Sequence, residues 1–219
     1  HVDELSPEMI KVRDYVPEYA VIAHRGSTFW TPEETESAYR WAREIGADYL
    51  ECDMQVSKDG VVLALHDDNL KRTTNIETVF GETLPREIRK NYYMKIGYSE
   101  TEAEEKVKAD EANFVPNLPA YYTYEELLML DAGSWFNNEN LEEALPGLAK
   151  EKQYISTLED LIMYSKGYRL IRDRNQPGMP RQYSIVGKTG ETITSLSGTA
   201  YIVKYDFGYE IDPVWEAGN

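Results

Sequence analysis

Residues 19–66 read YAVIAHRGSTFWTPEETESAYRWAREIGADYLECDMQVSKDGVVLALH, and this stretch decides the fold class. It opens with an apolar run at 19–23 that is short enough for a buried parallel strand. A helical pattern follows, and two further strand-like runs come at 47–56 and 61–65, separated by the turn signal Lys58-Asp59-Gly60. This order predicts a β-α-β-β unit of an α/β domain.

The helix is expected to begin at Thr31 and to end at Gly46. Thr31 suits the N-cap, Pro32 suits the first helical position, and Glu34 stands where it would close a capping box. The apolar residues that recur at helical spacing, and so predict the buried face, are Ala38, Trp41, Ala42 and Ile45.

Two carboxylates share one face of the strand predicted at 47–56. Successive side chains of a strand point to opposite faces, so Glu51 and Asp53 lie on the same side, about 7 Å apart at the backbone. Oxygen ligands placed in this way suit Mg²⁺ or Ca²⁺ far better than zinc. An acidic pair can also be the solvated face of an exposed strand, but a strand covered on both faces needs a cation to compensate two inward carboxylates. The pattern therefore predicts a divalent cation site.

His24 and His66 each follow an apolar strand run directly. Barrel enzymes place catalytic groups at the ends of parallel strands. A single histidine there is as often structural, but two at equivalent strand ends, with an acidic pair between them, indicate proton transfer. Arg25, next to His24, offers a planar guanidinium that can bind a phosphate in a bidentate manner, with a surface ion pair as the alternative.

The order, spacing and types of these residues resemble the N-terminal signature of the glycerophosphodiester phosphodiesterase family. The segments that carry the resemblance are His24-Arg25-Gly26, Pro32-Glu33-Glu34-Thr35, 46–53, Lys58-Asp59-Gly60-Val61, His66-Asp67 and 70–74, with 130–136 and 156–160 further on. The resemblance implies a TIM (β/α)8 barrel of the phospholipase C-like phosphodiesterase type.

The same resemblance implies a reaction and the roles of the site residues. His24 and His66 would act as the general acid and base, and Arg25 would hold the substrate phosphate. Glu51 and Asp53 would bind a divalent cation, Ca²⁺ or Mg²⁺. The expected reaction is the metal-dependent hydrolysis of a small glycerophosphodiester, such as glycerophosphocholine, to glycerol 3-phosphate and an alcohol.

Glu33 matches the glutamate of a family motif and would support the site by hydrogen bonding, with a helix-dipole interaction as the alternative. Glu34 departs from the family, which usually has Asn at this position. The third metal ligand of the family, a glutamate on the next barrel strand, has no clear match in this chain. The nearest candidate run is 201–204, which offers Val203 where a carboxylate is needed.

Beyond residue 75 the composition becomes polar and rich in Tyr and Glu, which predicts an insertion at 76–120. Helices are expected at 85–95 and 99–112 within it, and the insertion is placed where it could cover the barrel mouth. Thr123 and Thr157 are each followed three residues later by an acidic side chain, so both are expected to cap short helices.

From Gly167 onward, β-rich runs punctuated by Gly and Pro predict hairpins, and residues 167–210 are read as a β-rich excursion within a single domain of residues 1–219. A complete barrel needs eight strands and about 250 residues. The chain is therefore expected to hold only the N-terminal part of the barrel, which a missing C-terminal part or a second chain would complete.

The charge balance argues against one class of partner. The chain has 39 acidic and 23 basic residues and a net charge of −16, which would repel a nucleic acid backbone. No run of about 18 apolar residues predicts a transmembrane segment. Because the chain begins with His1, we expect that an upstream segment has been removed, and export to the periplasm or the extracellular space of a bacterium is expected, with the cytoplasm as the alternative. Cys52 is the single cysteine, which excludes an intrachain disulfide.

Two alternative functions stay open. A phospholipase D-like relative that acts on lysophospholipid or sphingomyelin would share the histidines and carboxylates, and a large apolar groove would favour it. A non-catalytic barrel fragment would keep the histidines without binding a metal ion.

Overall fold

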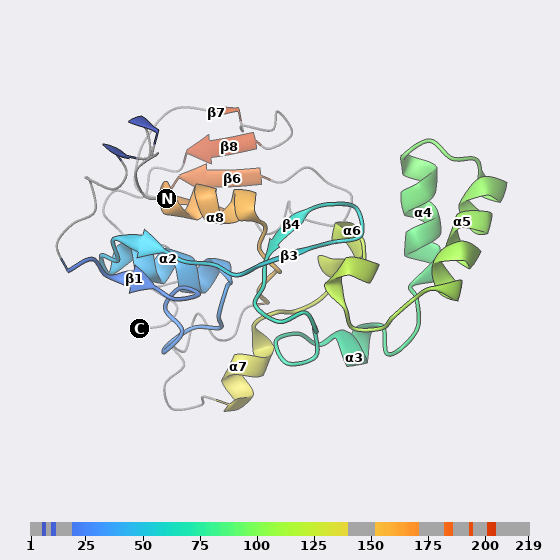
Figure 1. Ribbon diagram of the computed structural model, residues 1–219, viewed down its shortest axis with the longest axis horizontal. Coiled ribbons are helices and arrows are strands. Elements are labelled where there is room, and N and C mark those ends of the chain that lie inside the picture. The colour runs from blue at the N-terminus through green and yellow to red at the C-terminus, as the bar shows by residue number, and fades with distance from the viewer. Residues whose placement is uncertain are drawn as a thin grey trace.

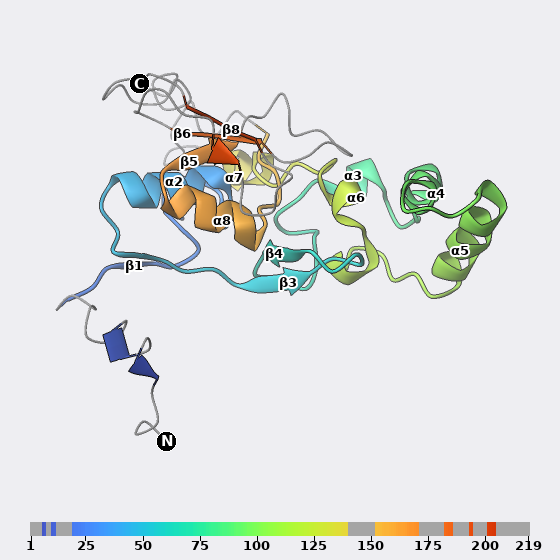
Figure 2. The same cartoon turned by 90° about the horizontal axis from the view of Figure 1, so that it is seen from above.

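The structure is a computed structural model, and it describes residues 6–7, 10–11, 19–139, 152–170, 182–185, 193–194 and 201–204. A pair of helices, α4 (Arg86–Lys95) and α5 (Glu100–Ala112), lies at one end of the molecule (Figures 1 and 2).

The predicted strand-helix-strand unit is present. Strand β1 (Ile22–Ala23) pairs in parallel with β2 (Tyr49–Leu50), and helix α2 (Glu36–Glu44) connects them. The prediction that the first strand is buried is wrong, because Ile22 is 60% exposed. The reason is that β1 has a strand on one side only among the described residues.

The second predicted strand is interrupted. Its first part is β2, its last part is β3 (Met54–Val56), and residues 51–53 between them belong to neither strand. Strand β3 pairs in antiparallel fashion with β4 (Val62–Ala64) across the predicted turn, where Gly60 has a φ of +84°. The chain therefore leaves the β1–β2 sheet at the residues that carry the acidic pair.

Helix α2 begins four residues later than its expected N-cap. The N-cap is Thr35, whose hydroxyl accepts from the backbone N–H of Ala38, whereas the Thr31 hydroxyl donates to the carbonyl of Ser27. The physical reason is the backbone of Glu34, which has a φ of +57° and cannot be part of a helix.

The predicted buried face of α2 is partly right. Ala38 and Ala42 are buried, as is Tyr39, but Ile45 is 57% exposed. The predicted end at Gly46 is confirmed, since Gly46 follows the C-cap with a φ of +93°.

Two clusters of buried side chains position the loops at the strand ends. One surrounds β4 and includes Leu63, Leu65, Leu70, Ile76, Tyr122, Leu127 and Leu130, with contributions from α3 (Ile76–Val79) and α6 (Tyr124–Leu127). The other joins α2 to α8 (Leu158–Ser165) and comprises Tyr39, Ala64, Leu161, Met163, Tyr164 and Leu170. These contacts fix α2, and with it the loop of residues 24–35 that leads into the helix.

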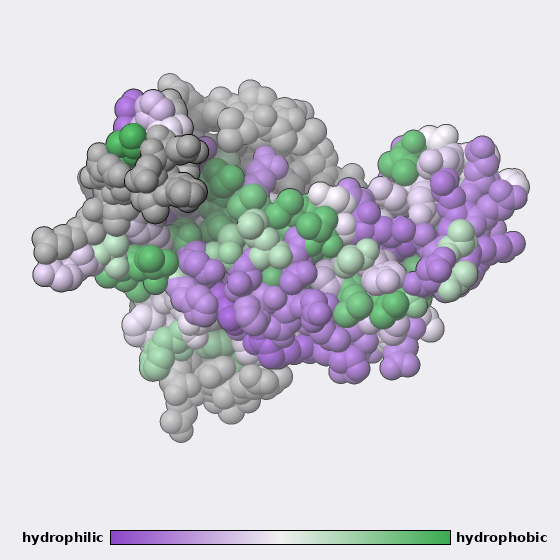
Figure 3. Space-filling model, in the orientation of Figure 1, coloured by the Kyte–Doolittle hydropathy of each residue, from purple (hydrophilic) through white to green (hydrophobic). Residues whose placement is uncertain are grey.

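The helices expected within 76–120 are confirmed as α4 and α5, and Ser99 and Glu102 form a capping box at the start of α5. Arg89 of α4 is 1% exposed and donates to both carboxylate oxygens of Glu126 in α6, which ties this helical pair to the core. Figure 3 shows a largely hydrophilic surface over the pair. In both ribbon views the pair lies away from β1 and β2, so it does not cover those strands.

Capping boxes at Thr123 and Thr157 are also confirmed. The remaining helical elements are the 3-10 helix η2 (Pro119–Tyr121) and α7 (Ser134–Glu139). No helix in the described ranges is long and apolar enough to cross a membrane.

A third sheet contains β5 (Tyr168–Leu170), β6 (Gln182–Ile185), β8 (Tyr201–Lys204) and β7 (Ile193–Thr194), in that order. Its antiparallel pairs β5–β6 and β7–β8 agree with the predicted hairpins, but the parallel pairing of β6 with β8 was not expected. Val203 lies in β8 opposite Ser184, in a different sheet from β1 and β2. Much of the predicted excursion at 167–210 falls outside the described residues.

Candidate functional site

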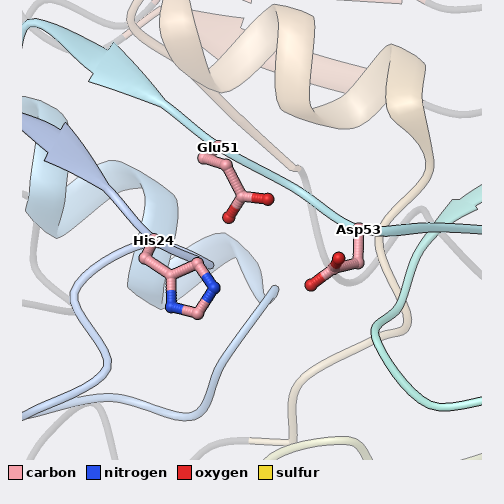
Figure 4. Close-up of side chains that lie close together, drawn as sticks. All are labelled: His24, Glu51 and Asp53. Carbon is pink, nitrogen blue, oxygen red and sulfur yellow. The ribbon is translucent and has the colours of Figure 1, made fainter.

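His24, Glu51 and Asp53 lie together where the β1–β2 sheet ends. The parallel register sets Ala23 opposite Leu50, so the next residue of each strand, His24 and Glu51, emerges at the same edge. The backbone N–H of Glu51 donates to the carbonyl of Ala23 at 3.1 Å and continues this pairing. The ligand atoms of the three residues all lie within 4.8 Å of one another, and Figure 4 shows the imidazole and the two carboxylates turned toward one another.

This cluster fits a divalent cation. Oδ2 of Asp53 is buried and has no hydrogen-bond partner among the described residues. The Nε atom of Arg25 lies 3.2 Å from this oxygen, close enough for an ion pair, but it is not aligned for a hydrogen bond. Two oxygens on opposite sides of one Ca²⁺ lie about 5 Å apart, so the spacing suits an ion held by Glu51 and Asp53.

Arg25 is held between two carboxylates. Its side chain contacts Glu33 at 3.3 Å as well as Asp53, and its backbone N–H donates to Oε2 of Glu51 at 3.0 Å. Its φ of +57° turns the chain sharply, and the following Gly26 has a φ of +88°. A Cβ atom on Gly26 would lie 2.7 Å from the backbone of Ala38, so only glycine lets this turn pack against α2.

His66 does not belong to the group of His24, Glu51 and Asp53, but a series of ion pairs connects it to Arg25 beside that group. Its Nδ1 lies 2.6 Å from Oδ1 of Asp67, and Arg72 binds Asp67 and Glu33 with two hydrogen bonds each. Glu33 in turn contacts Arg25, so a continuous series of contacts joins His66 to the cluster of His24, Glu51 and Asp53. His66, Glu33, Leu65 and Thr73 are among the residues that line one narrow crevice.

The charged side chains of this series of ion pairs stabilise one another. The hydrogen bond from Arg72 lowers the pKa of Asp67 to about 2, so Asp67 stays ionised at neutral pH. Burial acts to raise the pKa of Glu33, but the guanidiniums of Arg72 and Arg25 outweigh it, and the pKa lies below its usual value. Two ionised carboxylates are therefore available to orient His66 and Arg25.

Glu34 lies outside helix α2, although the capping pattern in the sequence assigns it to that helix. It is 3% exposed, and its Oε1 accepts from the backbone N–H of Asp53 at 2.7 Å instead of closing a capping box. Burial raises the pKa of Glu34 to about 8, against the opposing effect of the hydrogen bond from the backbone N–H of Asp53. Its left-handed backbone costs about 1–3 kcal/mol for a residue other than glycine.

The sequence predicts no individual role for Asp67 or Arg72. Both belong to segments that resemble the family signature, but the contact between Arg72 and Glu33 spans 39 residues and no local pattern indicates it. Cys52 packs against the core beside Leu50, and burial raises the pKa of its thiol to about 11, which makes it a weak nucleophile.

Comparison with known proteins agrees with the resemblance in the sequence. The model of the glycerophosphoryl diester phosphodiesterase family matches residues 24–182, which is more than half of the chain. Mouse (Mus musculus) glycerophosphoinositol inositolphosphodiesterase GDPD2 is 29% identical over 202 residues, which cover 88% of this chain and 32% of that protein. A glycerophosphodiester phosphodiesterase of Bacillus subtilis (strain 168) is 29% identical over 141 residues, which cover 64% of this chain and 34% of that protein.

Among solved structures, an Oleispira antarctica phosphodiesterase in complex with the product sn-glycerol-3-phosphate aligns with a TM-score of 0.43 and 25% identity, over 70% of this chain and 42% of that one. The chain spans about a third of the length of the two curated relatives. The chain belongs to the glycerophosphoryl diester phosphodiesterase family, a family of the TIM-barrel type, and its parallel β1-α2-β2 unit is consistent with an incomplete barrel.

Proposed function

We propose that this chain carries the catalytic cluster of a metal-dependent phosphodiesterase that hydrolyses glycerophosphodiesters to glycerol 3-phosphate and an alcohol. One observation carries the proposal: the ligand atoms of His24, Glu51 and Asp53 lie within 4.8 Å of one another, beside the guanidinium of Arg25. Family membership supports the same reaction class. The names of the relatives include both a glycerophosphodiester phosphodiesterase and a glycerophosphoinositol inositolphosphodiesterase, so a glycerophosphodiester is the substrate class they share.

In this proposal Glu51 and Asp53 hold the cation, and their oxygen donors favour Ca²⁺ or Mg²⁺. When bound, such an ion stabilises the negative charge that develops on the non-bridging phosphate oxygens. Arg25 adds a second positive charge at the phosphate, and its contacts with Glu33 and Asp53 fix its orientation beforehand.

His24 and His66 move the protons. The attacking hydroxyl must lose a proton and the leaving alcohol must gain one, and two imidazoles on opposite sides of phosphorus suit these two steps. His66 is directed by Asp67, which accepts from its Nδ1–H and so leaves Nε2 for the substrate. The attacking group is either water, which gives glycerol 3-phosphate directly, or the glycerol hydroxyl of the substrate, which expels the alcohol and forms a cyclic glycerophosphate that water then opens to glycerol 3-phosphate.

The lipid-hydrolysing alternative has less support. A groove of about 610 Å³ is lined in part by the apolar side chains of Ile88, Met94 and Met129. However, its lining residues belong to α4, to α6 and to the residues just after α6, not to the strand ends that carry His24 and Glu51.

Metal removal tests the proposed function. The full chain is expected to release choline and glycerol 3-phosphate from glycerophosphocholine in the presence of Ca²⁺ or Mg²⁺, to lose this activity in EDTA, and to regain it when the cation is restored. Both products are quantified, and glycerophosphoinositol is assayed in parallel to identify which ester bond breaks. Equal rates with and without EDTA would contradict the metal-dependent mechanism, and a chain that binds the cation but hydrolyses neither substrate would contradict the reaction.

Arg72→Gln tests the chain of ion pairs. We expect kcat to fall about 10-fold or more. Glu33 and Asp67 lose the guanidinium that joins them, and His66 therefore loses its fixed orientation. Steady-state kinetics on glycerophosphocholine measure the effect. Arg43→Gln, which removes a guanidinium from the surface of α2, is the matched control and should leave kcat unchanged. An unchanged kcat in Arg72→Gln would show that His66 does not depend on this contact.

A further inference from the structure

Glu34 contacts the backbone of a residue that carries a proposed cation ligand. Its Oε1 accepts from the N–H of Asp53 at 2.7 Å, across 19 residues of sequence. The side chain is 3% exposed, and its other oxygen, Oε2, has no hydrogen-bond partner among the described residues. The contact with Asp53 is therefore the hydrogen bond that this buried carboxyl makes in the described structure.

The backbone around Asp53 explains why such a contact matters. Residues 51–53 lie between β2 and β3 and belong to neither ladder. The carbonyl of Asp53 accepts from the N–H of Leu65 at 3.0 Å, which fixes one side of its peptide backbone. Glu34 fixes the other side and takes the place that a neighbouring strand would otherwise occupy.

Glu34 is itself held in an unusual conformation. Its φ is +57°, and its N–H donates to the carbonyl of Arg25 at 3.0 Å. Arg25 also has a φ of +57°, and its own backbone N–H donates to Glu51. Strained backbone that is tied to both acidic residues of the cluster is typical of a functional constraint.

We infer that Glu34 is a positioning residue that fixes the backbone at Asp53 and thereby aims the Asp53 carboxylate at the cation site. This inference rests on the proposed function, because it assigns a purpose to the orientation of Asp53. The contact needs only a hydrogen-bond acceptor of the right length. A neutral glutamine should therefore replace Glu34, whereas alanine should not.

The experiment compares Glu34→Ala and Glu34→Gln with the unsubstituted full chain. Amide hydrogen exchange at Asp53, followed by NMR on ¹⁵N-labelled protein, reads the hydrogen bond directly and needs no metal ion. We expect exchange at Asp53 to become at least about 10-fold faster in Glu34→Ala and to change by less than about 3-fold in Glu34→Gln. Calorimetric titration with Ca²⁺ should show an affinity about 10- to 100-fold lower in Glu34→Ala and nearly unchanged in Glu34→Gln.

Ser99→Ala serves as the control for a general loss of stability. It removes the helix cap of α5, at the end of the molecule away from β1 and β2, and should alter neither measurement at the cluster. Circular dichroism checks that every variant is folded at the temperature of the titration.

Each outcome decides the inference. An unchanged rate of amide exchange at Asp53 in Glu34→Ala would overturn the inference. An equal loss of Ca²⁺ affinity in Glu34→Gln and Glu34→Ala would also overturn it, because the site would then require the negative charge of Glu34. If the unsubstituted chain bound no Ca²⁺, the proposed cation site would fail. Amide exchange at Asp53 that is faster in Glu34→Ala but not in Glu34→Gln would then still support the role of Glu34 in fixing the backbone of Asp53.

Discussion

Glu51→Gln is expected to lower the affinity for Ca²⁺ at least about 100-fold and to abolish measurable turnover. Glutamine has nearly the same size as glutamate and can still accept the hydrogen bond that Arg25 donates through its backbone N–H. The substitution therefore removes the negative charge while it preserves the packing of the turn. Calorimetric titration with Ca²⁺ measures the affinity, and release of choline from glycerophosphocholine measures turnover.

Glu44→Gln is the matched control for this variant. Glu44 lies on the exposed side of α2, where it pairs with Arg43, and its loss should affect neither property. An equal Ca²⁺ affinity in Glu51→Gln and in the unsubstituted chain would show that Glu51 is not a cation ligand. A normal affinity combined with lost turnover would instead assign Glu51 to the substrate.

His24→Ala and His66→Ala are each expected to lower kcat for glycerophosphocholine by about 10²- to 10⁴-fold, the usual contribution of a general acid or base. The Ca²⁺ affinity of each variant, measured by calorimetry, shows whether the histidine transfers protons or binds the metal ion. His24 lies close enough to Glu51 and Asp53 to be a ligand, yet a group that moves protons should leave the Ca²⁺ affinity within about 3-fold of the original value when it is removed.

A substrate with a p-nitrophenol leaving group distinguishes the two histidines from each other. p-Nitrophenolate leaves without protonation, so the variant that lacks the general acid should recover most of its activity on this ester, while the variant that lacks the general base should not. Retained activity on glycerophosphocholine in either alanine variant would defeat the acid-base assignment. A Ca²⁺ affinity lowered at least 100-fold in His24→Ala would make His24 a ligand.

The convergence of the cluster could be predicted from the sequence because it depends on local geometry. Two short parallel strands end one residue before His24 and Glu51. Residues 51–53 belong to neither strand, yet Asp53 joins Glu51 in the cluster, as the alternation expected of a continuous strand predicts. The capping boxes at Thr123 and Thr157 were predictable for a similar reason, since each is formed by side chains three residues apart.

The features that the sequence did not reveal depend on contacts between distant segments. Thr31 has the residue type of an N-cap, but a turn held by Ser27 uses its hydroxyl, and the left-handed backbone of Glu34 delays the start of the helix. The capping pattern therefore assigned Glu34 to the helix, although its partner is the backbone of Asp53. Local propensity cannot anticipate such a competition.

Strand pairing in the four-stranded sheet of β5 to β8 also depends on contacts between distant segments. The apolar runs at β6 and β8 indicate strands, but their parallel pairing joins segments that are not adjacent in the chain. The exposure of β1 also has a non-local cause, because burial of a barrel strand requires a neighbour on each side. The boundaries of the insertion at 76–120 and of the excursion at 167–210 stay predictions.

The central claim is that Glu51 and Asp53 hold a divalent cation next to His24. Crystals of the full chain grown with Mn²⁺, measured at the manganese absorption edge, test this claim most directly. The account predicts an anomalous difference peak at about 2.1–2.3 Å from carboxylate oxygens of both Glu51 and Asp53. A map with manganese bound only elsewhere, or with no peak at these carboxylates at a saturating concentration of the ion, would contradict it.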